Sequence, residues 1–254
     1  MGLAAPVVTP AIYLASRQQA DGGFAEPAAA SFPELTAWAV VGLRARGADT
    51  GHALPYLVAH ENELKTSTSI ALVAVAEAAL GRDPDALLAR LGTEPHAVNE
   101  AVWTILARRQ ARRPAPKLVV NYVLRSQARN GGFSWRRGLA PDSNDTAFAL
   151  EALRAAGVRG RPITRAVAFL RRFQSRDGGF ELANGRGSDA QSTAVAIQAF
   201  VAAGVKPPGR AFSYLARLRR ADGSYRYSAR YVATPVWVTS QVLPALLRKP
   251  LPLH

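Results

Sequence analysis

The sequence predicts an all-α protein in which six pairs of helices form a closed double ring. Three observations lead to this prediction. A motif that ends in a glycine-rich turn and an aromatic residue recurs along the chain. An alanine-rich segment of about helical length follows each copy. The first helix of each pair carries arginines on one face, whereas the second is apolar on nearly all sides. Self-similarity of this kind is the signature of a repeat architecture.

The turn motif defines the first helix of each pair. Three copies are complete, with an aromatic residue, Leu or Val, Gln and a Gly-Gly-Phe turn at constant spacing; they span residues 13–24, 122–133 and 169–180. A fourth copy at 214–225 has Arg219 in place of Gln and ends in Gly-Ser-Tyr. A fifth copy begins at Tyr56 without the glycines, and a sixth, near Leu87, is barely recognisable.

The alanine-rich segments define the second helix. They begin at Thr36, Ile70, Ala101, Thr146, Thr193 and Pro235. Four of them end eleven residues later at a glycine suited to the left-handed position after a helix: Gly47, Gly81, Gly157 and Gly204. Ser69, Asp145, Ser192 and Thr234 directly precede four of the segments. Because such residues favour the N-cap, we expect these helices to begin there.

The apolar helices also determine the arrangement of the pairs. A helix that is apolar on all sides must be surrounded by other elements, so we place the second helices inside and the arginine-bearing ones outside. An open solenoid of the same units is the alternative. The absence of a polar capping repeat at either end favours closure.

Composition restricts the classes of function. The chain has 254 residues, of which 48% are hydrophobic and 20% charged, as in ordinary globular proteins. It contains no cysteine, which excludes disulfides, thiol catalysis and thiolate-bound zinc. We identify no membrane span, and residues 1–8 lack the features of a signal peptide. Cytoplasmic location and export through a leader outside this sequence both remain open.

These repeats resemble the QW-type repeat of the prenyltransferase and squalene-oxidocyclase superfamily, whose pattern is aromatic-Leu-x3-Gln-x3-Gly-x-aromatic. The resemblance covers essentially the whole chain and implies a single-domain (α/α)6 toroid over residues 1–254, with a short extended tail. It also implies that Gln18, Gln127 and Gln174 tie a helix end to the neighbouring unit. It specifies no activity, because the superfamily includes terpene cyclases, protein prenyltransferase subunits and binding domains.

A possible catalytic motif follows the fourth turn. Class II terpene cyclases protonate an alkene or epoxide with the middle Asp of an Asp-x-Asp-Asp-Thr-Ala motif. Residues 142–147 resemble this motif, with Asn144 at the position of the acid. An amide donates no acidic proton, so catalysis would depend on Asp145 or Asp142. The alternative is structural: Asp145 caps its helix, and the similar layout from Asp189 onward indicates a feature of the repeat.

The same register predicts a pocket. One residue before the expected caps, five of six positions are polar: Glu34, Thr68, Asn99, Asn144 and Gln191. Three residues after the caps lie the aromatic residues Trp38, Trp103, Phe148 and Trp237. Together with Asp189, these residues predict a polar rim and an aromatic floor for an isoprenoid or another apolar ligand. The alternative is that the aromatic rings fill the centre of the ring.

Other sites receive less support. The four histidines, His52, His60, His96 and His254, show no ligand spacing, so we predict no metal and no cofactor and exclude a zinc-dependent protein prenyltransferase. A glycosidase could take a carboxylate pair from Glu34, Glu100, Asp145 and Asp189, but no motif supports it. The net charge of +14 has two interpretations. Arginines near the C-terminal ends of helices complement the helix dipole, or the basic surface attracts an anionic membrane or cell-surface polymer. The chain has no nucleic-acid recognition module.

Two functions therefore remain. The first is a class II terpene-cyclase-like toroid that binds an isoprenoid or other apolar ligand in its central cavity. The alternative is a non-catalytic toroid that binds a small molecule, a peptide or a cell-envelope partner. A wide aromatic-lined chamber would support the first function, and a plugged centre the second. The sequence indicates neither a substrate nor an oligomeric state.

Overall fold

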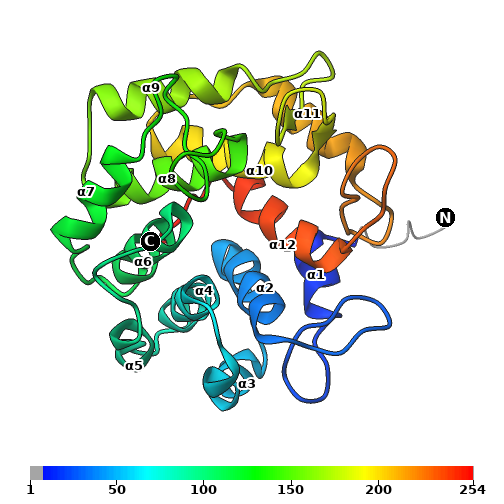
Figure 1. The fold of residues 1–254 in the computed structure, drawn as a ribbon. Coiled ribbons are helices and arrows are strands. Elements are labelled where there is room, and N and C mark those ends of the chain that lie inside the picture. Colours follow the sequence, from blue (N-terminus) through cyan, green and yellow to red (C-terminus); the bar gives the residue numbers. More distant parts are fainter. Residues whose placement is uncertain (1–7, 254) are drawn as a thin grey trace.

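The computed structural model describes residues 8–253, which contain twelve α-helices in two layers (Figure 1). The outer helices are α1 (Pro10–Ala15), α3 (Ala53–Ala59), α5 (Asp85–Ala89), α7 (Lys117–Arg125), α9 (Arg161–Arg171) and α11 (Gly209–Leu218). The inner helices are α2 (Pro33–Arg46), α4 (Ser67–Ala79), α6 (Val98–Gln110), α8 (Ser143–Ala155), α10 (Ala190–Ala202) and α12 (Pro235–Leu246). A 3-10 turn (η1, Glu61–Glu63) and an antiparallel pair of strands (β1, Phe180–Glu181; β2, Ser188–Asp189) complete these elements. The segment tested for a signal peptide falls, except for Val8, outside the described residues.

The inner helices form a closed ring. Each packs against the next in chain order, and α12 packs against α2, so the last inner helix meets the first (Figure 1). This arrangement confirms the predicted all-α toroid and excludes the open solenoid. None of the helices within residues 8–253 is both long enough and apolar enough to cross a bilayer.

The first glycine of each turn lies against the next outer helix. A Cβ atom would come within 2.5 to 2.7 Å of a backbone oxygen in the next unit; the pairs are Gly22 with His52, Gly131 with Arg165, Gly178 with Arg210, and Gly223 with Thr9. The last pair joins the sixth unit to the first. These positions also have positive φ angles, so glycine is required there for two independent reasons.

The Gln side chains reinforce the same contacts. The Nε2 atom of Gln18 donates to the carbonyl oxygen of Thr50 in the next unit at 3.0 Å, and that of Gln127 donates to Pro162 at 2.8 Å. The Gln174 amide donates to Gly178 within its own turn at 2.9 Å. Arg219, which replaces Gln in the last unit, donates to the carbonyl oxygen of Val8 at 2.9 Å. The predicted inter-unit role is therefore confirmed for Gln18 and Gln127.

Three inner helices begin earlier than the sequence predicts. Ser69, Asp145 and Ser192 are not N-caps; the caps are Thr66, Asp142 and Asp189. Their side chains accept hydrogen bonds from the backbone amides of Ser69, Asp145 and Ser192, respectively, at 3.0, 2.8 and 2.7 Å. The earlier residue is the N-cap because its backbone is extended and its side chain reaches the amide three positions later. Helix α12 begins after Thr234 as expected, but the Thr234 side chain makes no capping hydrogen bond.

The register of the last unit also differs from the prediction. The side-chain oxygens of Thr36, Thr146, Thr193 and Thr239 each accept a hydrogen bond from the backbone amide of the aromatic residue that closes their turn. Thr239, rather than Pro235, is therefore the counterpart of Thr36. Trp237 precedes its threonine by two residues, whereas Trp38 follows its own by two. This offset of four residues keeps Trp237 on the same helix face, about one turn away.

Loops of neighbouring units cover the beginnings of the inner helices, at the end of the ring called here the N-terminal mouth. The Trp135 carbonyl accepts a hydrogen bond from the Val98 amide at 2.8 Å, and the Tyr227 carbonyl accepts one from Ala190 at 2.7 Å. The Glu26 carboxylate of the first unit accepts hydrogen bonds from the first amides of α12, those of Val236 and Trp237, at 2.9 and 2.8 Å. We call residues 25–32, 134–141, 182–187 and 226–233 the mouth loops.

The turn glycines permit a matched test of the inter-unit contact. Gly131→Ala places a methyl group 2.5 Å from the Arg165 carbonyl oxygen, whereas Gly157→Ala, also at positive φ, meets nothing within 4 Å. In urea unfolding we expect Gly157→Ala to cost about 1 kcal/mol through backbone strain alone. Gly131→Ala should cost about 2 kcal/mol more through overpacking. Equal losses would show that the close approach contributes nothing.

Candidate functional site

Four aromatic rings meet inside the toroid. Trp38, Trp103, Phe148 and Trp237 come from α2, α6, α8 and α12. The contacts of Trp38 with Trp103 and with Phe148 join helices that are not neighbours in the ring. The centroid of Trp38 lies 5.7 Å from that of Trp103 and 6.1 Å from that of Trp237, and Trp103 lies 5.2 Å from Phe148. These separations and the tilted or edge-on geometries are those of favourable aromatic pairs. We call these four residues the aromatic cluster.

Little space remains beside the aromatic cluster. The cavity at the N-terminal mouth has a volume of about 10 Å³ and is lined by Val98, Asn99, Val102, Trp103, Ser134, Asp145 and Phe148. A volume of this size holds about one water molecule. Small-molecule pockets typically have about 300–1,000 Å³. This cavity is therefore too small for an isoprenoid, and ligand binding by the aromatic residues stays a prediction.

Asp145 contributes a carboxyl group to this cavity. It lies in the first turn of α8, where Asp142 takes the capping role, so its side chain is not engaged as an N-cap. Desolvation by burial, and then the neighbouring Asp142 carboxyl, raise the pKa of Asp145 to about 8. A carboxylic acid that is neutral at pH 7 beside aromatic faces has the protonation state that a general acid needs.

The other predicted polar residues are dispersed. Asn99 lines the cavity, whereas Glu34, Asn144, Gln191 and Asp189 do not. Asn144 accepts a hydrogen bond from the Ser143 hydroxyl at 3.3 Å. Asp189 is occupied as the cap of α10, where its two oxygens accept from the amide and hydroxyl of Ser192. The structure thus brings Asn99 and Asp145 to the aromatic cluster and leaves the remaining rim residues away from the cavity.

The sequence analysis missed Ser134, the buried serine that lines the cavity. It belongs to a mouth loop, and its hydroxyl donates to the Arg136 carbonyl oxygen at 2.7 Å. Its only signal is a position directly after the Gly-Gly-Phe turn, which the other units do not share as serine.

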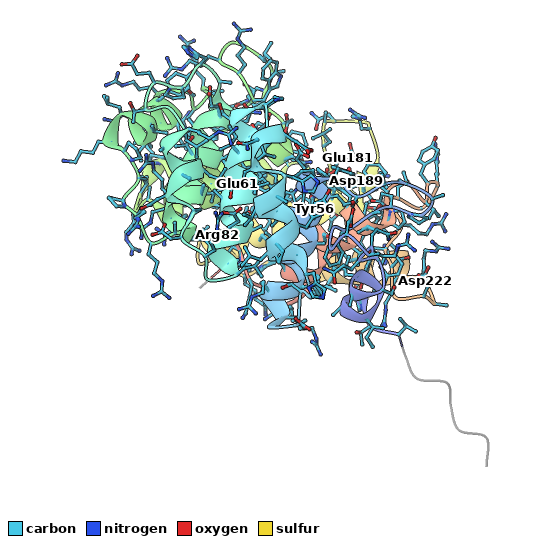
Figure 2. All side chains as sticks on the ribbon, turned by 90° about the horizontal axis from the view of Figure 1, so that it is seen from below. Tyr56, Glu61, Arg82, Glu181, Asp189 and Asp222 are labelled. Carbon is cyan, nitrogen blue, oxygen red and sulfur yellow. The ribbon has the colours of Figure 1, made fainter. Side chains whose placement is uncertain are left out.

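A larger groove lies at the N-terminal mouth between two mouth loops. It has a volume of about 450 Å³ and is lined by Asp177, Tyr214 and residues 185–189 and 227–231. The Tyr214 hydroxyl donates to the Ser188 carbonyl oxygen at 2.6 Å, which braces one side. Figure 2 shows Asp189, which lines the groove, near Glu181 of the same hairpin. Sequence analysis missed this groove because it forms between loops that differ from unit to unit.

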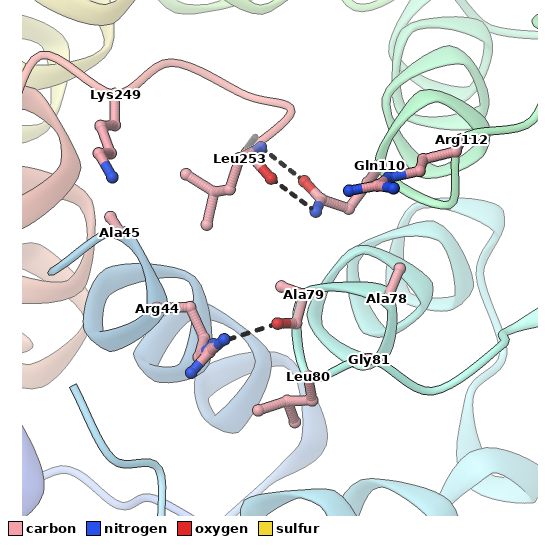
Figure 3. Close-up of a pocket in the computed structure, with 10 residues that line it drawn as sticks. All are labelled: Arg44, Ala45, Ala78, Ala79, Leu80, Gly81, Gln110, Arg112, Lys249 and Leu253. Carbon is pink, nitrogen blue, oxygen red and sulfur yellow. Dashed lines mark hydrogen bonds between the residues drawn. The ribbon is translucent and has the colours of Figure 1, made fainter. Parts of the chain in front are cut away.

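The opposite end of the ring is closed by the tail that follows α12. The Leu251 amide donates to the Glu151 carboxyl group of α8 at 2.7 Å. The Gln110 side chain of α6 accepts from the Leu253 amide at 2.6 Å and donates to the Leu253 carbonyl oxygen at 3.1 Å (Figure 3). A pocket of about 370 Å³ lies beside these contacts, with Arg44 and Lys249 in its lining (Figure 3).

Buried carboxyl groups on other inner helices have structural partners. Glu77 of α4 pairs with Arg82, which also pairs with Glu61 at the surface (Figure 2). Burial raises the pKa of Glu77 to about 7, against the opposing effect of Arg82. Within residues 8–253, no three acidic or histidine side chains are grouped as metal ligands.

Several solved structures superpose on this chain over most of its length. A type II terpene cyclase from Scytonema superposes with a TM-score of 0.72 at 15% identity, over 94% of this chain and 95% of that one. The chain has the type II terpene cyclase fold. The ent-copalyl diphosphate synthase of Streptomyces platensis matches with a TM-score of 0.57 at 17% identity, over 85% of this chain and 50% of that enzyme. A glycosidase with a TM-score of 0.62 and 13% identity, covering 94% of each chain, shares the fold. No protein-family model and no curated protein sequence matches the chain.

Replacing Trp103 tests whether the aromatic cluster is structural. Trp103 is 7% exposed, and we expect Trp103→Ala to lower the free energy of unfolding by about 3–5 kcal/mol, because it leaves a cavity among packed rings. Trp135, which is 48% exposed, is the matched control, and Trp135→Ala should change stability by less than about 1 kcal/mol. A small effect of Trp103→Ala in urea unfolding would contradict a plugging role.

Glu151 makes stability depend on pH. Desolvation raises its pKa from 4.5 to about 8, while the hydrogen bond from Leu251 opposes the shift. Between those values the unfolded chain releases this proton and the folded chain retains it, so stability falls as pH rises. The change in the free energy of unfolding caused by Glu151→Gln should therefore be more favourable at pH 7 than at pH 4, by about 1–3 kcal/mol.

The measurement is urea unfolding at both pH values, with Glu94→Gln as an exposed control. The control should show no comparable pH-dependent gain. A Glu151→Gln effect that is the same at pH 4 and pH 7 would contradict the raised pKa.

Proposed function

We propose that this toroid is a binding protein without cyclase activity, and that its ligand binds at the N-terminal mouth rather than in the ring centre. The observation that carries the proposal is the aromatic cluster, which leaves about 10 Å³ beside Asp145. Cyclisation requires a chamber in which a flexible isoprenoid is folded and shielded from water. Opening such a chamber here would separate packed aromatic rings that are anchored on four inner helices.

The groove between the mouth loops is the site that suits this function best. Its volume of about 450 Å³ is in the range of small-molecule pockets. Tyr227 and Tyr231 line it beside Tyr214, whose hydroxyl is bound to Ser188, and Arg186 and Arg230 add donors. The groove therefore suits a polar small molecule or a short peptide better than a hydrocarbon chain.

A second candidate function is class II cyclase activity with Asp145 as the proton donor. One observation favours it: Asp145 is a carboxyl group with a pKa of about 8 that shares its cavity with Trp103 and Phe148. A structure of the Scytonema cyclase contains its geranylgeranyl dihydroxybenzoate substrate. For the present chain, this function requires the aromatic cluster to separate when an apolar ligand enters.

Product analysis separates the two functions. Purified protein is incubated with squalene and with geranylgeranyl diphosphate, and a type II terpene cyclase with its own substrate serves as the positive control. We expect no cyclic product from the wild-type protein or from Asn144→Asp. A cyclic product that Asp145→Asn abolishes would establish the second function. A product from Asn144→Asp alone would indicate a cyclase scaffold that lacks its acid.

Tryptophan fluorescence provides an independent measurement of the ring centre. Three of the four tryptophans belong to the aromatic cluster, so in Trp135→Phe all remaining tryptophans report on it. Titration of this variant with geranylgeraniol should leave the emission unchanged if the centre stays closed. A saturable change in emission would show that an apolar ligand enters the aromatic cluster.

A further inference from the structure

We propose that the mouth loops form a docking surface for a phospholipid bilayer with anionic headgroups. The first observation is the distribution of exposed apolar side chains. Within residues 8–253, eight large hydrophobic side chains are exposed, and five belong to the mouth loops: Phe32, Trp135, Leu139, Tyr231 and Val232. The other three, Ile12, Val58 and Leu118, lie apart on the outer helices α1, α3 and α7.

The backbone contacts of the mouth loops place these side chains at one end of the molecule. Three mouth loops lead into the inner helices α2, α8 and α12, and the loop 182–187 leads into α10 through β2. The carbonyl groups of Trp135, Leu182 and Tyr227 accept hydrogen bonds from the first amides of the neighbouring inner helices. Glu26 makes the corresponding contact to α12 with its carboxylate. The four loops therefore follow one another along the same mouth of the ring.

The charge of this surface has one sign. The mouth loops contain five arginines, Arg136, Arg137, Arg186, Arg226 and Arg230, and a single acidic residue, Glu26. The Glu26 carboxylate is turned inward, because it accepts the amides of α12.

Three of these arginines are available to a partner. Arg137 contacts Tyr122 and the Ser126 hydroxyl, and Arg226 donates to the Ala229 carbonyl oxygen. Arg136, Arg186 and Arg230 are exposed, and their side chains have no hydrogen bond or ion pair within the described chain. The surface thus carries more arginines than carboxylates, and Asp189 is the carboxyl group that interacts electrostatically with Arg186.

The docking surface covers only part of the mouth. The segments before α4 and α6, residues 61–66 and 92–97, contain three acidic residues, Glu61, Glu63 and Glu94, against one lysine, Lys65, and none of the exposed apolar side chains. Glu61 is paired with Arg82. A bilayer would therefore contact the side of the mouth formed by α8, α10, α12 and α2. The acidic side would be turned away from an anionic surface.

A bilayer accounts for both components of this surface. Tryptophan and tyrosine favour the interface between headgroups and hydrocarbon, and each arginine near an anionic leaflet contributes about 1 kcal/mol. An anionic polysaccharide would engage the arginines but would leave Trp135, Leu139 and Val232 in water. The combination therefore favours a lipid surface over a soluble polyanion.

Vesicle co-sedimentation tests the proposal. The full chain is mixed with phosphatidylcholine vesicles that contain either no or about one quarter phosphatidylglycerol, at about 0.15 M salt. Three variants are compared with wild type. The apolar variant combines Trp135→Ser, Leu139→Ser and Tyr231→Ser; the arginine variant combines Arg136→Ala, Arg186→Ala and Arg230→Ala; the matched control combines Ile12→Ser and Leu118→Ser. Urea unfolding verifies that each variant is folded.

We expect wild type and the control to bind the phosphatidylglycerol vesicles, and both mouth-loop variants to lose at least about tenfold in affinity. Heparin affinity, measured in parallel, should fall in the arginine variant and persist in the apolar variant. Wild-type protein that does not sediment with anionic vesicles would overturn the proposal. So would full vesicle binding by the apolar variant, because the surface would then be a site for polyanions, or an equal loss in the control.

Discussion

The structure depends on the closure of the ring, because the apolar inner helices have no other way to bury their surfaces. Closure requires the sixth unit to repeat toward the first the contacts that the units with a complete glycine turn make with the next. Gly223 approaches Thr9 as Gly131 approaches Arg165, and Arg219 reaches Val8 as Gln127 reaches Pro162. The longer reach of arginine lets the last unit meet the first although its turn has lost the Gln. The Glu26 carboxylate completes the joint by holding the first amides of α12.

The aromatic cluster fills part of the space that closure of the ring creates. Six parallel inner helices enclose an axial space, which must either be filled by side chains or hold solvent or a ligand. Here four inner helices supply large rings that meet, and Trp38 contacts Trp103 and Phe148 from helices that are not its neighbours in the ring. Packed rings gain dispersion contacts that an empty chamber would forfeit. The ring can thus be closed whether or not its axis is filled, because the contacts that close it lie away from the axis.

Repeat contacts could be predicted from the sequence, and contacts made once could not. The turn glycines and Gln18 and Gln127 recur at fixed spacing, and the all-α ring followed from them. The helix starts were misplaced because Asp142 and Asp145 are both good caps, and the spacing to Thr146 does not distinguish them. Trp237 shared a pattern with Trp38, but the hydrogen bond from Tyr225 to Thr239 sets a different register. No periodic pattern predicts the groove, Ser134 or the tail contact at Glu151, because they belong to segments that occur only once in the sequence.

Because Asp142 rather than Asp145 caps α8, the Asp145 carboxyl group has a different environment from the one expected of an N-cap. An N-cap carboxylate is held ionised by the helix amides, and its role is structural. One turn position further on, the same side chain faces Phe148 and Trp103 and loses water without gaining a cation, which is why its pKa rises. A neutral carboxyl group is the least costly state for that position whether or not it ever donates a proton. Its raised pKa is therefore accounted for by burial together with the neighbouring Asp142 carboxyl. The choice between acid catalysis and structure depends on whether the aromatic rings beside it ever separate.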